Sequence, residues 1–228
     1  DMIAVLAGNY SESDHNAIQD ILKAVPTGSP VKINCASAAI KKTERIESTD
    51  PRIQQAKLYV TAAAPRTADK ESVYNKILSD LLGGGMSSPY FTALRKERGY
   101  AYSVGVSYPS RLCSSRMTGY IGLQEENIDD AIQVMRELNS TVAANITEEE
   151  LEKTKNHMIG QLLLEEETNC RTAFYAAFCE NLGVGVDCMN SYVEQIRGVK
   201  KADRQKAAKI FDKPYAVFVF KPQNPNKE

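Results

Sequence analysis

The order of predicted strands and helices constrains the fold of this chain most strongly. Residues 41–65 and 101–123 each predict two extended segments joined by a turn or short loop. Helical patterns then follow almost without interruption from residue 127 to residue 211, and a last strand is predicted at 215–222. Strands that come in adjacent pairs favour an antiparallel or mixed sheet. We therefore expect an α+β fold, with helices packed on one face of that sheet.

The N-terminal segment is predicted to stand apart from this sheet. Residues 2–8 are a short apolar run ended by glycine, which is typical of a strand buried on both faces. Residues 11–25 place apolar side chains at helical spacing, with a serine or an aspartate available as N-cap. The start has no signal-peptide pattern and resembles the middle of a longer chain. We expect residues 1–30 to end a preceding half or to link it to a main domain at residues 31–228.

Charge and hydropathy argue against two classes of partner. The chain of 228 residues has a net charge of −1, whereas proteins that bind nucleic acids or anionic membranes normally carry a basic excess. No apolar run approaches the roughly 20 residues that a membrane-spanning helix needs. We therefore expect no nucleic-acid partner and no membrane span.

The cysteines bear on the compartment of the protein. Their number is odd and no CxxC pair occurs, which favours buried, reduced thiols over disulfides or metal ligation. Two of them lie on helical patterns, which is a poor framework for disulfides. This interpretation favours a reducing, cytoplasmic compartment; periplasm or an organelle stays open if a targeting signal has been trimmed. The cysteines are Cys35, Cys113, Cys170, Cys179 and Cys188.

Several common kinds of active site lack their residues. The two histidines, His15 and His157, have no His or Cys partner at metal-ligand spacing, and the zinc motif H-x-x-E-H is absent. The nucleophile motif G-x-S-x-G is also absent. A phosphate-binding loop follows a strand, whereas the three glycines at 83–85 follow a helical pattern. We therefore expect no metal ligands and no nucleotide site in this chain.

The glycines at 83–85 separate helical patterns at 69–82 and 88–98. Ser88 is the predicted N-cap of the second helix, because Pro89 suits the first helical position. Arg95 lies near the end of that helix, and Tyr102 lies at the start of the next predicted strand. By residue pattern alone, these two are a solvated arginine and a half-buried sheet tyrosine.

Residues 81–104, LLGGGMSSPYFTALRKERGYAYSV, resemble a signature found in the C-terminal halves of pitrilysin, insulysin and mitochondrial processing peptidase. These enzymes are inverzincin zinc peptidases. In the signature, a Gly-rich turn precedes S-S-x-(L/Y)-F-x-x-L-R-x-x-x-G-(L/Y)-A-Y. The similarity extends to residues 3–28, 145–168 and 194–211, so it covers nearly the whole chain.

The resemblance implies a composite active site. In this family two similar α+β halves, or two similar subunits, enclose an extended polypeptide. One half binds zinc through H-x-x-E-H, and the other contributes an arginine and a tyrosine, which map to Arg95 and Tyr102. Tyr100 is a neighbour that the mapping does not select. The loop that faces the partner half and lines the substrate chamber maps to Gly83, Gly84, Gly85, Ser87 and Ser88.

The function implied by this resemblance is that of the substrate-binding half of a zinc-dependent endopeptidase, which cleaves peptides or unfolded polypeptide. Zinc is expected on a zinc-bearing N-terminal half or a separate partner subunit, and not on this chain. Because H-x-x-E-H is missing, we expect the isolated chain to be inactive. The alternative is a non-catalytic structural or assembly subunit that keeps the same fold.

Overall fold

The computed structural model describes residues 2–29, 34–35 and 39–223. The chain divides into two compact units. The helical unit joins Asp1–Asn34 to His157–Arg197, and the sheet unit joins Cys35–Asn156 to Gly198–Glu228. The predicted domain boundary after residue 30 falls outside the described residues and stays a prediction.

The sheet unit is built on a five-stranded mixed sheet in the order β1-β5-β2-β4-β3. β1 and β5 are parallel, and the other neighbours are antiparallel, as the paired strand patterns predict. β1 and β2 are consecutive in the sequence, but the C-terminal strand β5 lies between them. The strands are β1 (Glu44–Asp50), β2 (Ala56–Ala64), β3 (Val104–Ser107), β4 (Ser115–Leu123) and β5 (Tyr215–Pro222).

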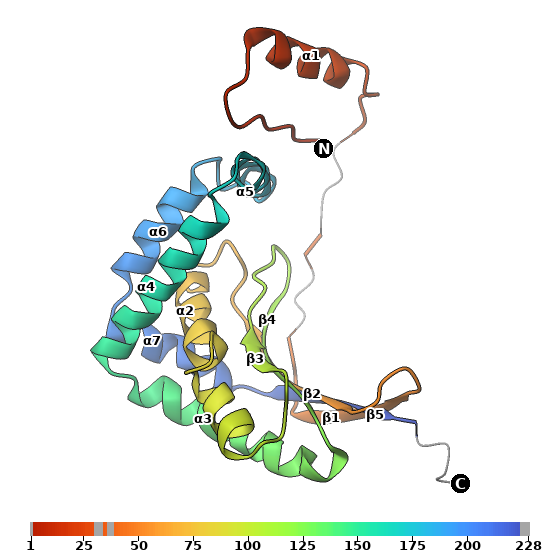
Figure 1. Cartoon of the computed structure of the whole chain (residues 1–228), viewed down its shortest axis with the longest axis vertical. Helices are drawn as coiled ribbons and strands as arrows, with labels where there is room; N and C mark the ends of the chain where they lie inside the picture. Colours follow the sequence, from red (N-terminus) through yellow and green to blue (C-terminus); the bar gives the residue numbers. More distant parts are fainter. Residues whose placement is uncertain (1, 30–33, 36–38, 224–228) are drawn as a thin grey trace. The chain divides into compact units, whose positions relative to one another are not determined.

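Helices cover one side of this sheet (Figure 1). Leu58 and Val60 of β2 are buried against them, whereas Lys57, the residue before Leu58, points to the other side and is exposed. Burial of one such leucine contributes about 1.5–3 kcal/mol, so the alternation fixes which face each strand presents. The predicted α+β layering is confirmed. The helices of this unit are α2 (Ser72–Gly83), η1 (Phe91–Glu97), η2 (Glu125–Asn127), α3 (Ile128–Asn145), α7 (Lys201–Ala208) and η3 (Lys209–Asp212), together with the first part of α4 (Glu148–Glu165).

The helical unit contains α1 (Glu12–Lys23), α5 (Asn169–Asn181) and α6 (Cys188–Gly198), together with the end of α4 (Glu148–Glu165). α1 confirms the predicted helix, because the Ser11 hydroxyl accepts from the Asp14 N–H at 3.3 Å and the Asp14 carboxylate accepts from the Ser11 N–H at 2.9 Å. No helix in the described ranges is long and apolar enough to cross a membrane.

The strand predicted at residues 2–8 is wrong. These residues adopt no regular structure, and most of their side chains are partly or fully exposed. A strand needs a neighbour to pair its main-chain groups, and all five described strands belong to the sheet unit. The apolar run therefore has no sheet to join within its own unit.

The prediction of reduced thiols is wrong for four of the five cysteines. Cys35 is disulfide-bonded to Cys113 in the sheet unit, and Cys179 is bonded to Cys188 in the helical unit. Between α5 and α6 the chain turns at Gly183 and Gly185, which have φ values of +72° and +85°. This turn brings Cα atoms of the second pair within 5.9 Å, so helical position does not prevent the bond. The cysteines therefore give no support to a reducing compartment.

Candidate functional site

The three glycines at the C-terminal end of α2, Gly83 to Gly85, have different surroundings. A Cβ on Gly83 would collide with the main-chain nitrogen of Val106 in β3, so this glycine allows the helix end to pack against the strand. A Cβ on Gly84 would collide with Asp80 one turn earlier in α2. Gly85 has a φ of +153° and no neighbouring atom within 4 Å of the Cβ position. The Gly-rich turn is present, but space for a side chain exists only at Gly85 among these three glycines.

The exposed part of this loop is short. Met86 is 80% exposed, and Ser87 is also exposed. Ser88 is buried, and its hydroxyl accepts from the Phe91 N–H at 3.4 Å. Helical residues begin at Pro89 and continue into η1, so the predicted N-cap is confirmed. Ser88 thus caps the helix that carries Arg95, whereas Gly85, Met86 and Ser87 are exposed to solvent.

The structure brings Arg95 and Tyr102 together. Arg95 Nη1 donates to the main-chain carbonyl of Tyr102 at 2.7 Å, and Arg95 Cζ lies 4.9 Å from the centre of the Tyr102 ring. Gly99, with a φ of +67°, turns the chain between the two residues. Tyr102 lies two residues before β3 and is 84% exposed, so it is not the half-buried sheet residue that its pattern suggests.

Phe91 completes this arrangement. Its ring centre lies 4.8 Å from Arg95 Cζ, so the guanidinium contacts two aromatic rings. Each such contact contributes about 0.5–1 kcal/mol at an exposed site. The sequence analysis did not select Phe91. Its spacing of four residues from Arg95 could have identified it, because residues four apart in a helix share a face.

Arg95 keeps hydrogen-bonding capacity for a ligand. A guanidinium has five N–H donors, and one of them donates to Tyr102. Among the described residues, Arg95 takes part in no ion pair with a carboxylate. The arginine is therefore a fixed cation whose remaining donors suit a carbonyl oxygen or an oxyanion.

Tyr100 has a different environment from Tyr102. Its hydroxyl donates to Asp130 at 3.0 Å, and the same carboxylate accepts from Arg98 Nε at 3.2 Å. The hydrogen bond to Asp130 raises the pKa of Tyr100, and burial and the carboxylate charge add to this effect. Tyr100 and Arg98 thus anchor the chain to α3. In the described part of the chain the hydroxyl of Tyr102 has no such partner.

The described residues do not fit a metal ion. No three His, Cys, Asp or Glu side chains within the described ranges are grouped so that they could hold one. His15 belongs to α1 and His157 to α4, and neither lies in the segment around Arg95. The chemistry that these residues offer is hydrogen-bond donation and positive charge.

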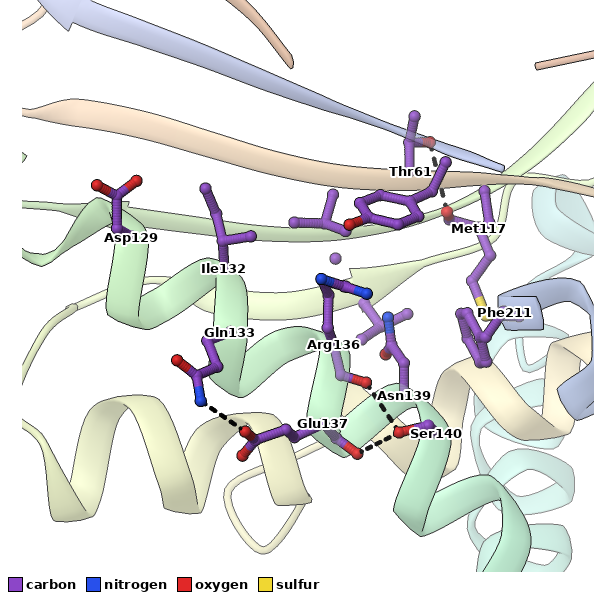
Figure 2. Close-up of a pocket in the computed structure, with 15 residues that line it drawn as sticks. Thr61, Met117, Asp129, Ile132, Gln133, Arg136, Glu137, Asn139, Ser140 and Phe211 are labelled. Atoms are coloured by element: carbon purple, nitrogen blue, oxygen red, sulfur yellow. Dashed lines mark hydrogen bonds between the residues drawn. The ribbon is translucent and has the colours of Figure 1, made fainter. Parts of the chain in front are cut away.

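A separate cavity of about 590 Å³ lies between the sheet and α3 (Figure 2). Arg136 points towards the sheet in this view, and its Cζ lies 4.9 Å from the centre of the Tyr215 ring. Gln133 donates to Glu137 at 2.9 Å, and Asn139 accepts from the hydroxyl of Tyr90 at 2.9 Å. These contacts join α3 to itself, to the sheet through Tyr215 and to the helical segment before η1 through Tyr90, so we assign them to the packing of the fold.

Comparison with known sequences gives one family. The family described as Peptidase M16 inactive domain matches residues 1–158. An uncharacterized zinc protease of Streptomyces coelicolor is 25% identical over 174 residues, which are 72% of this chain and 37% of that protein. The uncharacterized zinc protease YmxG of Bacillus subtilis is 36% identical over 104 residues, which are 44% of this chain and 25% of that protein. The chain therefore spans only part of the length of these relatives.

Solved structures show the same fold. A protease from Helicobacter pylori superposes with a TM-score of 0.82 at 16% identity, over 95% of this chain and 54% of the other. The peptidase M16 inactive domain from Pseudomonas fluorescens superposes with a TM-score of 0.80 at 17% identity, over 96% of this chain and 52% of the other. Identity at this level supports the fold alone, and the fold is shared over nearly the whole chain.

Proposed function

This chain belongs to the peptidase M16 inactive-domain family, and we propose that it is the substrate-binding half of a zinc-dependent endopeptidase. Membership places the chain within a family of zinc proteases, and the resemblance drawn from the sequence is confirmed at that level. The family description and the absence of H-x-x-E-H both separate this chain from the zinc-bearing half. Its contribution to peptide cleavage must therefore come from its own donors and surfaces.

The single observation that supports this proposal is the pairing of Arg95 with Tyr102. In the proposed role, the remaining N–H groups of Arg95 and the hydroxyl of Tyr102 bind the oxygen of the scissile carbonyl. Negative charge develops on that oxygen when the carbon becomes tetrahedral, and fixed donors stabilise it. The contact with Phe91 and the hydrogen bond to the Tyr102 carbonyl hold Arg95 before substrate arrives, so little ordering is needed during the reaction.

Zinc in the complete enzyme is proposed to be bound by the other half. The described residues of this chain offer no ligand set for it. Zinc supplies a Lewis acid and an activated water in peptidases of this kind. The chain spans 54% and 52% of two solved structures that share its fold, which leaves room for a second half of similar size in proteins of that length.

Reconstitution tests this proposal. The 228-residue chain would be assayed against a panel of fluorogenic peptides, alone and with the zinc-bearing half, with and without a zinc chelator. Cleavage that needs both halves and is abolished by the chelator supports the proposal. Cleavage by the chain alone would contradict it. A complete pair that binds together but cleaves nothing would favour the non-catalytic structural subunit.

A further inference from the structure

The side of the sheet opposite the helices carries a row of apolar and aromatic side chains. Ile46 of β1 lies opposite Phe218 of β5 in the strand register. Phe218 lies opposite Tyr59 of β2, which in turn lies opposite Tyr120 of β4. The Tyr120 ring extends over β3, because a Cβ on Gly105 would approach its hydroxyl at 2.8 Å. The row thus crosses all five strands, which at about 4.8 Å per gap is roughly 19 Å.

We call this side of the sheet the open face. It consists of the row and of its neighbours Phe220, Lys57, Arg116, Lys41 and Lys42. Ile46 is 43% exposed, and Tyr59, Tyr120 and Phe218 are half-buried. Phe220, next to the row on β5, is 37% exposed and packs edge-on against Tyr59 with ring centroids 6.0 Å apart. Aromatic side chains in this arrangement offer apolar contact area at low cost in conformational entropy.

Positive charge lies on both sides of the row. On one side, a hollow of about 370 Å³ is lined by Phe218 together with the cations Lys41, Lys42 and Arg116, and by one carboxylate, Glu44. On the other side, Lys57 stands in the register position opposite Phe220. None of the ion pairs among the described residues engages these four cations. Asp50, which lies within electrostatic reach of Lys57, is ion-paired with Arg52, so the open face keeps an excess of positive charge although the whole chain has a net charge of −1.

We propose that the open face binds an extended acidic polypeptide segment that carries aromatic or aliphatic side chains. A row of roughly 19 Å accommodates about six residues of extended chain, since each residue spans about 3.3 Å. Apolar side chains of the segment would contact the aromatic row, and its carboxylates would lie near Lys41, Lys42, Arg116 and Lys57. This inference rests on the proposed function only where the bound segment is taken to be a substrate. Binding to the open face itself requires no catalysis.

Single-stranded nucleic acid is the competing occupant to test. Basic and aromatic side chains on a sheet also bind single strands, through base stacking and phosphate contacts. The polypeptide is favoured because the chain lacks the overall basic excess of a nucleic-acid-binding protein and belongs to a peptidase family.

Fluorescence anisotropy with the 228-residue chain tests the inference. The probes are labelled peptides of about eight residues that alternate Phe with Glu, with Gln or with Lys, and a single-stranded oligonucleotide of similar length. We expect the Glu peptide to bind most tightly, and its affinity to fall as ionic strength rises from about 0.05 to 0.3 M. Equal affinity for the Glu and Gln peptides, or tighter binding of the oligonucleotide, would overturn the inference.

Matched variants locate the site. Lys57→Glu combined with Arg116→Glu should weaken binding of the Glu peptide about tenfold. Lys76→Glu combined with Lys153→Glu reverses the same number of exposed charges on α2 and α4, and should change affinity less than about twofold. Equal losses in the two double variants would overturn the placement on the open face. The assay involves no cleavage, so binding that persists while the reconstituted enzyme is inactive would reject the proposed function and leave this inference standing.

Discussion

Phe91 and Arg95 lie four residues apart in η1, and the Arg95 guanidinium carbon is 4.8 Å from the centre of the Phe91 ring. Tyr102 contacts the same guanidinium with its ring and accepts a hydrogen bond from it through its main-chain carbonyl. The arginine is thus held from two directions while Tyr102 itself remains exposed. This arrangement fixes the guanidinium while using one of its five N–H donors.

Phe91→Leu should lower kcat of the complete enzyme about two- to fivefold and change KM little, because the substitution keeps apolar volume and removes the ring beneath Arg95. Phe91→Tyr retains an aromatic face and should restore kcat. Phe178→Leu, which removes an exposed ring in the helical unit, is the matched control. Steady-state kinetics on the four enzymes checks this. Equal kcat values for Phe91→Leu and Phe178→Leu would show that the ring does not position Arg95.

Tyr100→Phe should leave peptidase activity within about twofold of the parent, because the Tyr100 hydroxyl is engaged with Asp130.

The Tyr100→Phe variant should also change how stability depends on pH in the alkaline range. The pKa of Tyr100 is raised in the folded protein, so its stabilising contribution is present below about pH 10 and is lost as pH rises through the folded pKa. Denaturant unfolding at neutral pH and above pH 10 measures this, and the parent should lose more stability over that range than Tyr100→Phe. Equal losses in the two proteins would contradict the assignment.

Gly83→Ala should destabilise the sheet unit by about 1–3 kcal/mol, because the added methyl group would press on the main chain of β3. Gly160→Ala is a suitable comparison, since its Cβ position in α4 has no atom within 4 Å. Alanine favours a helix interior over glycine, so that variant should gain up to about 1 kcal/mol. Chemical denaturation followed by circular dichroism gives both values. A Gly83→Ala protein as stable as the parent would mean that the helix end does not pack on β3.

Alkylation of the unfolded protein without reductant should modify Cys170 alone, and alkylation after reduction should modify all five cysteines. Peptide mass spectrometry identifies the modified cysteines.

Reduction should also lower the free energy of unfolding. Loss of the Cys179–Cys188 bond should cost about 2–3 kcal/mol, and loss of Cys35–Cys113, which spans 78 residues, should cost more. Modification of all five sites without reductant would contradict the pairing.

Local patterns in the sequence predicted most of the elements. Thr147 illustrates this, because the spacing to Glu150 predicts a capping box and the structure has both hydrogen bonds, at 2.8 Å and 3.2 Å. The position of β5 between β1 and β2 was not predictable in this way, since pairing between distant strands leaves no local signal. The Cys35–Cys113 pairing was missed for the same reason.

The candidate site was predictable only in part. Arg95 and Tyr102 were selected through their place in the family signature, and the turn at Gly99 that brings them together follows from the glycine itself. The contribution of Phe91 depends on where two side chains point, which its spacing indicates but does not determine. Gly83 and Gly84 show the same limit, because the atoms that a Cβ would meet belong to β3 at Gly83 and to Asp80 of α2 at Gly84.

The most direct measurement is kcat of the complete two-half enzyme carrying Arg95→Ala, with Tyr102→Phe and Lys153→Ala assayed beside it. If Arg95 and Tyr102 stabilise the reacting carbonyl oxygen, each of their variants loses about 10²- to 10³-fold in kcat, while the surface control Lys153→Ala retains the activity of the parent. Arg95→Ala and Tyr102→Phe enzymes that fold, assemble and cleave at the parent rate would contradict the account.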